Sequence, residues 1–267
     1  MSTTEISVDT YLRSVLERLE QQYRIMAIQF GPPAVVTQGS ELSYRYPKQS
    51  DALLCFLKGV KLVSTLNAAL VLLHHGYVHE VAALCRMVDD FWNEILFMIQ
   101  TLDGDKLNKD QERFLADFFQ EEFEDVEDPL GSSQKRETVP RRKIFAAVAQ
   151  LGSQHVNPFD GQSAAAIIHR TLSGYTHGAY PHIMELYDGN PPRVHMTGMP
   201  GTPQEEVWRQ QLIGYIHRGI MVSERVSKKL GLKETQGHLQ TLLFEFERKL
   251  GIVPELDADK LLREIKR

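Results

Sequence analysis

A glycine between two long apolar segments restricts the fold of this chain more than any other feature of its sequence. Residues 51–74 form a nearly all-apolar helical pattern that follows a capping sequence at Ser50, and residues 77–102 form a second long pattern directly after Gly76. A helix that is apolar around its whole circumference must be buried, and so short a turn places two consecutive helices antiparallel. We therefore predict that the two segments form an antiparallel hairpin at the core of the protein.

Helical periodicity also dominates the rest of the chain, and neither an alternating strand pattern nor a fixed-period repeat stands out. The other predicted helices are 7–28, 109–124, 141–151, 162–178, 203–230, 233–250 and 256–266, with an irregular segment between the first helix and about Pro47. The prediction is an all-α protein, an irregular helical bundle built around the hairpin. We expect a single helical domain, 1–267, with an N-terminal helix and arm (1–50), a core that holds the candidate site (51–190) and C-terminal helices (203–267).

Composition and charge narrow the class of protein. Hydrophobic residues make up 42% of the chain and charged residues 24%, which excludes wholesale disorder. The formal net charge of −5 argues against a general nucleic-acid coat, although a local basic groove is compatible with it. The only cysteines, Cys55 and Cys85, lie in apolar helical patterns and are expected to be buried thiols in a reducing compartment.

The sequence also predicts a protein without membrane contact. Its N-terminus lacks a basic region followed by an apolar core, so no secretory signal is expected there. The most apolar stretch, Leu62 to Leu73, is interrupted by polar residues and is too short to span a bilayer. The expected location is the cytoplasm.

Potential chemistry is concentrated between His169 and Gly178. If 162–178 is helical, Arg170 and His177 are separated by a rotation of about 700° and lie on nearly the same face, roughly 10 Å apart along the axis. Gly174 lies between them and leaves a notch on that face. The arginine could bind phosphate and the histidine could act as a general acid or base. Equally, Arg170 could be an ordinary surface residue and His177 a helix C-terminal residue.

Polar side chains in the second hairpin helix form a supporting group of candidates. Arg86 and Asp90 are four residues apart and can pair across one helical turn. A functional interpretation is that this pair, together with Glu80, Ser173 and Tyr175, orients or supplements Arg170 and His177 from across the bundle. The alternative is that Arg86 and Asp90 belong to an ordinary solvated stripe.

Two further patterns have weaker functional interpretations. His75 and His79 are four residues apart, but Gly76 is expected to break the helix between them, and metal-binding motifs are missing from the sequence. We therefore predict neither a metal site nor a cofactor. The basic residues at 135–143 could follow a phosphate backbone, or they could form a solvated loop balanced by the acidic run at 121–128.

The spacing of Arg170 and His177 on a helix of an all-α protein resembles that in the HEPN superfamily, whose ribonuclease members carry an Arg-x4–6-His motif near a helix end. The residues around Gly76, Arg86 and Asp90, with the later Leu172-Ser173-x-Tyr175-x-His177-Gly178, also resemble a group of uncharacterised bacterial helical proteins. The resemblance covers roughly 50–190. It departs from the superfamily at Thr171, where a polar Asn, Asp or His is commoner.

For active HEPN members the resemblance implies metal-independent cleavage of RNA, with paired motifs across a dimer. Arg170 would stabilise the scissile phosphate and His177 would transfer a proton. The leading hypothesis is thus a HEPN-like endoribonuclease of a stress or phage-defence type, with RNA as substrate and a second copy of the chain as partner. The alternative is a non-catalytic helical module that binds a ligand or another protein.

Overall fold

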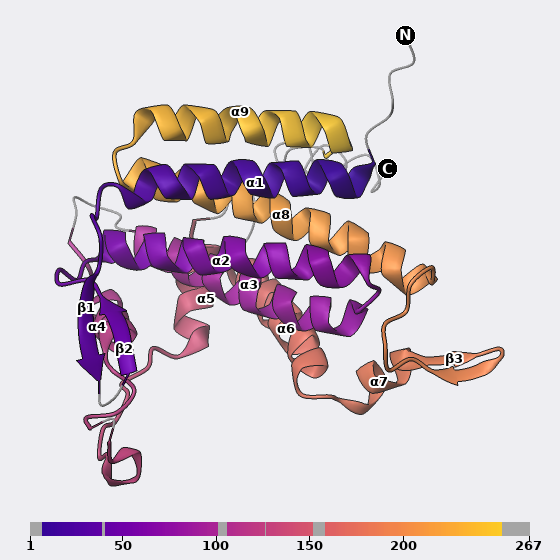
Figure 1. Ribbon diagram of the computed structural model, residues 1–267, viewed down its shortest axis with the longest axis horizontal. Helices are drawn as coiled ribbons and strands as arrows, with labels where there is room; N and C mark the ends of the chain where they lie inside the picture. Colours follow the sequence, from indigo (N-terminus) through magenta and orange to yellow (C-terminus); the bar gives the residue numbers. More distant parts are fainter. Residues whose placement is uncertain (1–6, 39–40, 101–105, 126, 152–157, 253–267) are drawn as a thin grey trace.

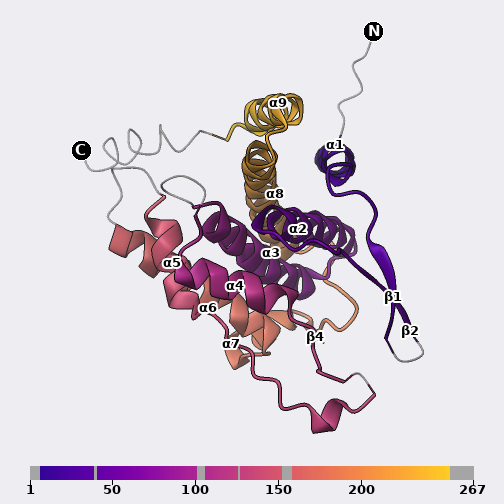
Figure 2. The same cartoon turned by 90° about the vertical axis from the view of Figure 1, so that its left-hand side faces the viewer.

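The two apolar helices predicted to form a hairpin are largely buried at the centre of the molecule, as their composition requires. The computed structural model describes residues 7–38, 41–100, 106–125, 127–151 and 158–252. Helix α2 (Asp51–His74) begins at Ser50, whose side chain accepts a hydrogen bond from the Leu53 backbone N–H. Helix α3 (Val78–Ile99) returns along α2, and the two helices lie side by side in both views of Figures 1 and 2.

Gly76 makes the turn between α2 and α3 in a left-handed conformation, with φ of +73°. The backbone N–H groups of Gly76 and Tyr77 donate to the carbonyl oxygens of Leu73 and Leu72, respectively. This is the Schellman arrangement, which closes a helix and satisfies its last carbonyl groups. The turn is packed against a distant loop, because the Met199 N–H donates to the Gly76 carbonyl at 2.7 Å.

Helices α1 (Val8–Ala27), α8 (Pro203–Lys229) and α9 (Lys233–Leu250) cover one side of the hairpin. In Figure 1 they lie above α2, with α9 outermost. The apolar stripe of α1 is fully buried, as its helical spacing demands. Helix α1 approaches α2 closely at Gly59, where a Cβ atom would lie only 2.1 Å from the Tyr23 hydroxyl oxygen.

Shorter helices cover the other side of α3 and carry the candidate site. They are α4 (Lys109–Phe119), α5 (Arg141–Ala149), α6 (Pro158–Thr176) and α7 (Tyr180–Ile183), with 3-10 turns η1 (Pro129–Gly131) and η2 (Met184–Leu186). Helices α5 and α6 pack against each other and against α3. Helix α6 begins four residues earlier than predicted and ends at Thr176, because Gly178 turns the chain with φ of +61°.

The prediction of a helical protein is confirmed, and the described residues also form two small two-stranded sheets. An antiparallel hairpin, β1 (Ala34–Gln38) and β2 (Glu41–Arg45), occupies the arm that was expected to be irregular. A second hairpin joins β3 (Tyr187–Gly189) to β4 (Pro192–Val194). The signal for the first was present: β-branched Val35, Val36 and Thr37 precede a Gly-Ser pair of the kind that connects two strands.

The length and composition of α2 also meet the criterion for a membrane-crossing helix. Its most apolar 18-residue window has a mean hydropathy of 1.6, and half of that window is buried by the rest of the protein. A core helix of a soluble protein passes the same test, so this is weak evidence, and the absence of membrane contact stays a prediction. The predicted helix at 256–266 lies outside the described residues.

Candidate functional site

Charged side chains from three helices form a cluster on the inner side of α3. Arg86 pairs with Asp90 one turn along α3, and both side chains are largely buried, with exposed fractions of 14% and 18%. Arg141 of α5 places Nη1 2.9 Å from Asp90 Oδ1 and 2.9 Å from Glu94 Oε1. Lys58 of α2 adds a further ion pair to this cluster, with its Nζ atom 2.6 Å from Glu94 Oε2. Positive and negative groups therefore alternate, as burial of charge requires.

Arg86 extends this cluster to α6. Its Nε donates to Ser173 Oγ at 3.1 Å, and its Nη2 donates to His169 Nε2. Since a guanidinium can only donate, His169 Nε2 must be the unprotonated nitrogen of a neutral ring. Burial, with Arg86 nearby, lowers the pKa of His169, which favours that neutral ring. We call the set Lys58, Arg86, Asp90, Glu94, Arg141, His169 and Ser173 the inner cluster.

Asp89 belongs to a separate buried group on a neighbouring face of α3, which packs against α8. Its Oδ1 accepts from Arg218 of α8 at 3.3 Å, and its backbone carbonyl accepts from the Asn93 amide at 2.7 Å. The carboxyl group is almost fully buried, and that burial raises its pKa from 3.8 to about 6, against the opposing effect of Arg218. Two adjacent aspartates on one helix thus have distinct environments.

We expect Asp89→Asn to change how stability depends on pH. The raised pKa means that the folded protein holds this proton while the unfolded chain has lost it, so wild-type stability falls as the pH rises from about 4 to about 6. A shift of this size is worth about 3 kcal/mol, at about 1.4 kcal/mol per pH unit. Urea unfolding of both proteins at pH 4 and pH 7 should show the variant gaining most of this amount relative to wild type as the pH rises. A difference that is the same at both pH values would contradict the assignment.

Arg170 on α6 and His177, the first residue after its end, are exposed. Within the described residues, neither side chain has a hydrogen bond or ion pair. Arg86 therefore reaches the helix that carries the motif, but it contacts Ser173 and His169 rather than Arg170 or His177. The two pairs lie on neighbouring faces of the helix: His169 and Ser173 face Arg86, whereas Arg170 and His177 are exposed.

The notch predicted at Gly174 is filled by another side chain. A Cβ atom at this position would lie 2.3 Å from Cε1 and 2.5 Å from Nδ1 of His182 on α7. The expectation of an empty notch is therefore wrong, because the chain folds back after Gly178 and places an imidazole ring against the glycine. Because glycine has no side chain, position 174 leaves room for the His182 ring.

Tyr175 is enclosed by rings from three other elements. Its ring centroid lies 4.2 Å from that of His182, 5.3 Å from that of His79 on α3 and 5.3 Å from that of Trp208 on α8. Its hydroxyl donates to Glu185 Oε2 at 2.9 Å. Burial, and then the Glu185 carboxylate, raise the pKa of this phenol. Tyr175 thus faces inward and anchors α7, instead of lining an open face.

Glu80 lies in the first turn of α3, where a carboxylate suits the positive end of the helix dipole. It is exposed, and among the described residues it forms no hydrogen bond or ion pair with Arg86 or with α6. The structure therefore brings together Arg86, Asp90 and Ser173 from the predicted site, and leaves Glu80 apart.

Several polar residues with defined partners had no predicted role. His169 and His182 flank the motif, and Lys58 is one of two lysines, with Lys61, inside the apolar pattern of α2. A charge in a mostly apolar helix must have a partner where it is buried, so Lys58 was a usable signal for the inner cluster. The contact of His182 with Gly174 had no signal in the sequence, because it depends on how α7 folds back.

The basic residues at 135–143 are largely engaged by other groups. Lys143 pairs with Asp110 at 2.8 Å, Arg136 donates to the Gln120 carbonyl at 3.1 Å, and Arg141 belongs to the inner cluster. These contacts support the interpretation of a charge-balanced segment over that of a phosphate-binding patch. Among the described residues, no group of three or more His, Cys, Asp or Glu side chains is placed to hold a metal ion.

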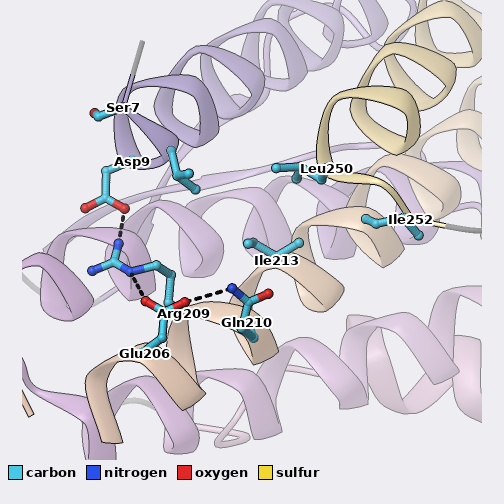
Figure 3. A pocket seen from close by; sticks show the side chains of 9 residues that line it. Ser7, Asp9, Glu206, Arg209, Gln210, Ile213, Leu250 and Ile252 are labelled. Carbon is cyan, nitrogen blue, oxygen red and sulfur yellow. Dashed lines mark hydrogen bonds and ion pairs between the residues drawn. The ribbon is translucent and has the colours of Figure 1, made fainter. Parts of the chain in front are cut away.

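A cavity of about 490 Å³ lies at the start of α1, far along the chain from the motif (Figure 3). Its wall combines apolar side chains of α8 and α9 with Arg209, which pairs with Asp9 and lies 3.2 Å from Glu206. Gln210 donates to the same glutamate at 2.8 Å. Among the described residues, the charged groups of this wall thus pair with one another, which gives the cavity no free charge with which to bind a ligand.

Comparison of the chain with models of known protein families, with curated proteins and with solved structures found no match.

Proposed function

We propose that this protein is a HEPN-like irregular helical bundle that cleaves RNA without a metal ion, using Arg170 and His177. The proposal rests on the exposure of these two side chains and on their lack of contacts with other described residues. Both are exposed on one helix, at a spacing that puts them on nearly the same face, and neither has a protein partner among the described residues. A guanidinium and an imidazole left accessible in this way can both reach one phosphodiester.

The inner cluster has a positioning role in this proposal. Arg86 holds α6 through hydrogen bonds to Ser173 and His169, and Arg141 joins α5 to Asp90 and Glu94. A helix fixed by hydrogen bonds to a partly buried guanidinium presents its exposed side chains in a constant geometry, which catalysis requires. Arg170 would stabilise the negative charge that develops on the phosphate, and His177 would transfer a proton.

Partner and location follow from the same proposal. The substrate is RNA in the cytoplasm, and two copies of the chain pair with their motifs close together. Support for pairing comes from large apolar side chains that are exposed near the motif: Ile167 is 58% exposed, Tyr180 76% and Ile183 48%. Apolar side chains that cluster on a surface commonly mark a protein interface.

Cleavage of RNA by the purified protein in EDTA tests the proposal. We expect wild-type protein to cleave, and Arg170→Ala and His177→Ala each to lower the rate by about 10²-fold or more, the scale for loss of charge stabilisation or of a general acid or base. Exposed Arg13→Ala and His238→Ala are matched controls and should cleave as wild type does. Cleavage that requires a metal ion and ignores both motif variants would refute the mechanism.

A second candidate is a non-catalytic module that binds another protein. The observation that favours it is the exposure of large apolar side chains, which is repeated after α7 at Tyr187, Val194 and Met196, with exposed fractions of 45%, 56% and 83%. Absence of RNA cleavage by pure wild-type protein would favour this candidate over the ribonuclease.

A further inference from the structure

The imidazole of His182 lies against α6 between the levels of Arg170 and His177. Gly174, which the ring covers, is four residues after Arg170 and three before His177, so it is about 6 Å and about 4.5 Å from them along the helix axis. A Cβ atom at Gly174 would lie 2.3 to 2.9 Å from three atoms of the ring, so any other residue here would displace it. The chain therefore places a second imidazole beside the motif.

Neighbouring groups fix this ring without occupying its buried nitrogen. Tyr175 contacts it edge-on, with ring planes at 73°, and the tyrosine is itself held by Glu185. His182 is half-buried, and its Nδ1 is buried with no hydrogen-bond partner in the described part of the chain. The other ring nitrogen, Nε2, is not buried and forms no hydrogen bond with the described residues, so it is the nitrogen that a substrate or water can reach.

We propose that His182 is a second catalytic residue, and that it shares with His177 the two proton transfers of RNA cleavage. This rests on the proposed function. Cleavage without a metal ion needs one group that removes a proton and another that supplies one, and a single imidazole cannot do both in the same step. Histidine suits both roles because it exchanges protons near neutral pH.

The reaction is a transesterification that needs no other reactant. One imidazole, neutral at the start, takes the proton from a ribose 2′-hydroxyl, and the 2′-oxygen forms a bond to the neighbouring phosphorus. The bond from phosphorus to the 5′-oxygen breaks, and the other imidazole, protonated at the start, gives its proton to that oxygen. The products carry a 2′,3′-cyclic phosphate and a 5′-hydroxyl, and Arg170 neutralises charge on the phosphoryl oxygens.

The pH dependence of the rate reports on both imidazoles and on their surroundings. The groups that face His182 are Tyr175 from α6, Glu185 from η2 and His79 from α3, and His177 and Arg170 lie along α6. A reaction that needs one neutral and one protonated imidazole has a bell-shaped pH profile. Removal of either histidine should abolish the limb of the profile that belongs to it.

The test compares His182→Ala and His182→Gln with His177→Ala and with the control His238→Ala in the same EDTA assay. We expect both His182 variants to lose about 10²-fold or more in rate, the scale for loss of a general acid or base. Of the two limbs of the bell-shaped pH profile, the His182 variants should lose the limb that His177→Ala retains. The control should retain the full rate. A substrate with a 2′-deoxy residue at the cleaved position should not be cut, and the products should carry cyclic phosphate ends.

The outcomes separate the two proposals. If wild type cleaves, His177→Ala does not, and both folded His182 variants retain the rate and both limbs, the role of His182 is wrong while the proposed function stands. If wild-type protein does not cleave, the proposed function fails, and the role of His182 fails with it. Circular dichroism of each variant verifies that it is folded.

Discussion

Gly76→Ala is expected to destabilise the protein by at least about 4 kcal/mol, a large effect for one methyl group. The left-handed backbone at this position costs a residue with a Cβ atom about 1–2 kcal/mol. The larger part comes from a backbone clash, because the Cβ would lie 2.4 Å from Pro200 N and 2.7 Å from the Met199 carbonyl carbon. The loop at Met199 would have to move and give up its hydrogen bond to the Gly76 carbonyl. Urea unfolding measures the change.

Gly231→Ala is the matched control. Gly231 also closes a helix, α8, with φ of +72° and the same pair of backbone hydrogen bonds, from Gly231 to Lys228 and from Leu232 to Ser227. A Cβ atom at this position would meet no atom of the described chain within 4 Å, so only the conformational cost of about 1–2 kcal/mol applies. Equal losses of stability in the two variants would show that the contact with the loop at Met199 contributes nothing.

Arg86→Ala should cost about 3–5 kcal/mol, the range for removal of one partner from a buried ion pair. The substitution leaves the largely buried Asp90 with Arg141 alone, and it removes the donors to His169 Nε2 and Ser173 Oγ. The contact between α3 and α6 should loosen as a result. Chemical denaturation measures the loss, and hydrogen exchange of α6 amides should rise more than that of α1 amides.

Arg24→Ala is the corresponding surface substitution. Arg24 pairs with Glu20 at the same four-residue spacing, but its side chain is 78% exposed. Such pairs contribute about 0.5 kcal/mol or less. If Arg86→Ala is no more destabilising than Arg24→Ala, the inner cluster does not stabilise the attachment of α6.

The fold was predictable where a local pattern has one physical solution. The apolar density of residues 51–74 requires burial, and Gly76 permits a tight reversal, so the helical hairpin could be predicted with its bounds nearly correct. The hairpin of β1 and β2 was missed because its two strands are short and largely exposed, so no clear apolar alternation marks them. Its signal was the Gly-Ser pair between β-branched residues and Ser43-Tyr44.

The sequence by itself determined which residues carry charge on α3, and that Arg86 and Asp90 can meet, because both facts follow from helical spacing. Only the tertiary structure decided that Arg86 contacts Ser173 and His169 instead of the motif, since helical spacing does not set the rotation of α6 against α3. The position of His182 over Gly174 was decided in the same way. A glycine in a helix shows that space is available, and the fold of the following chain determines which side chain fills it.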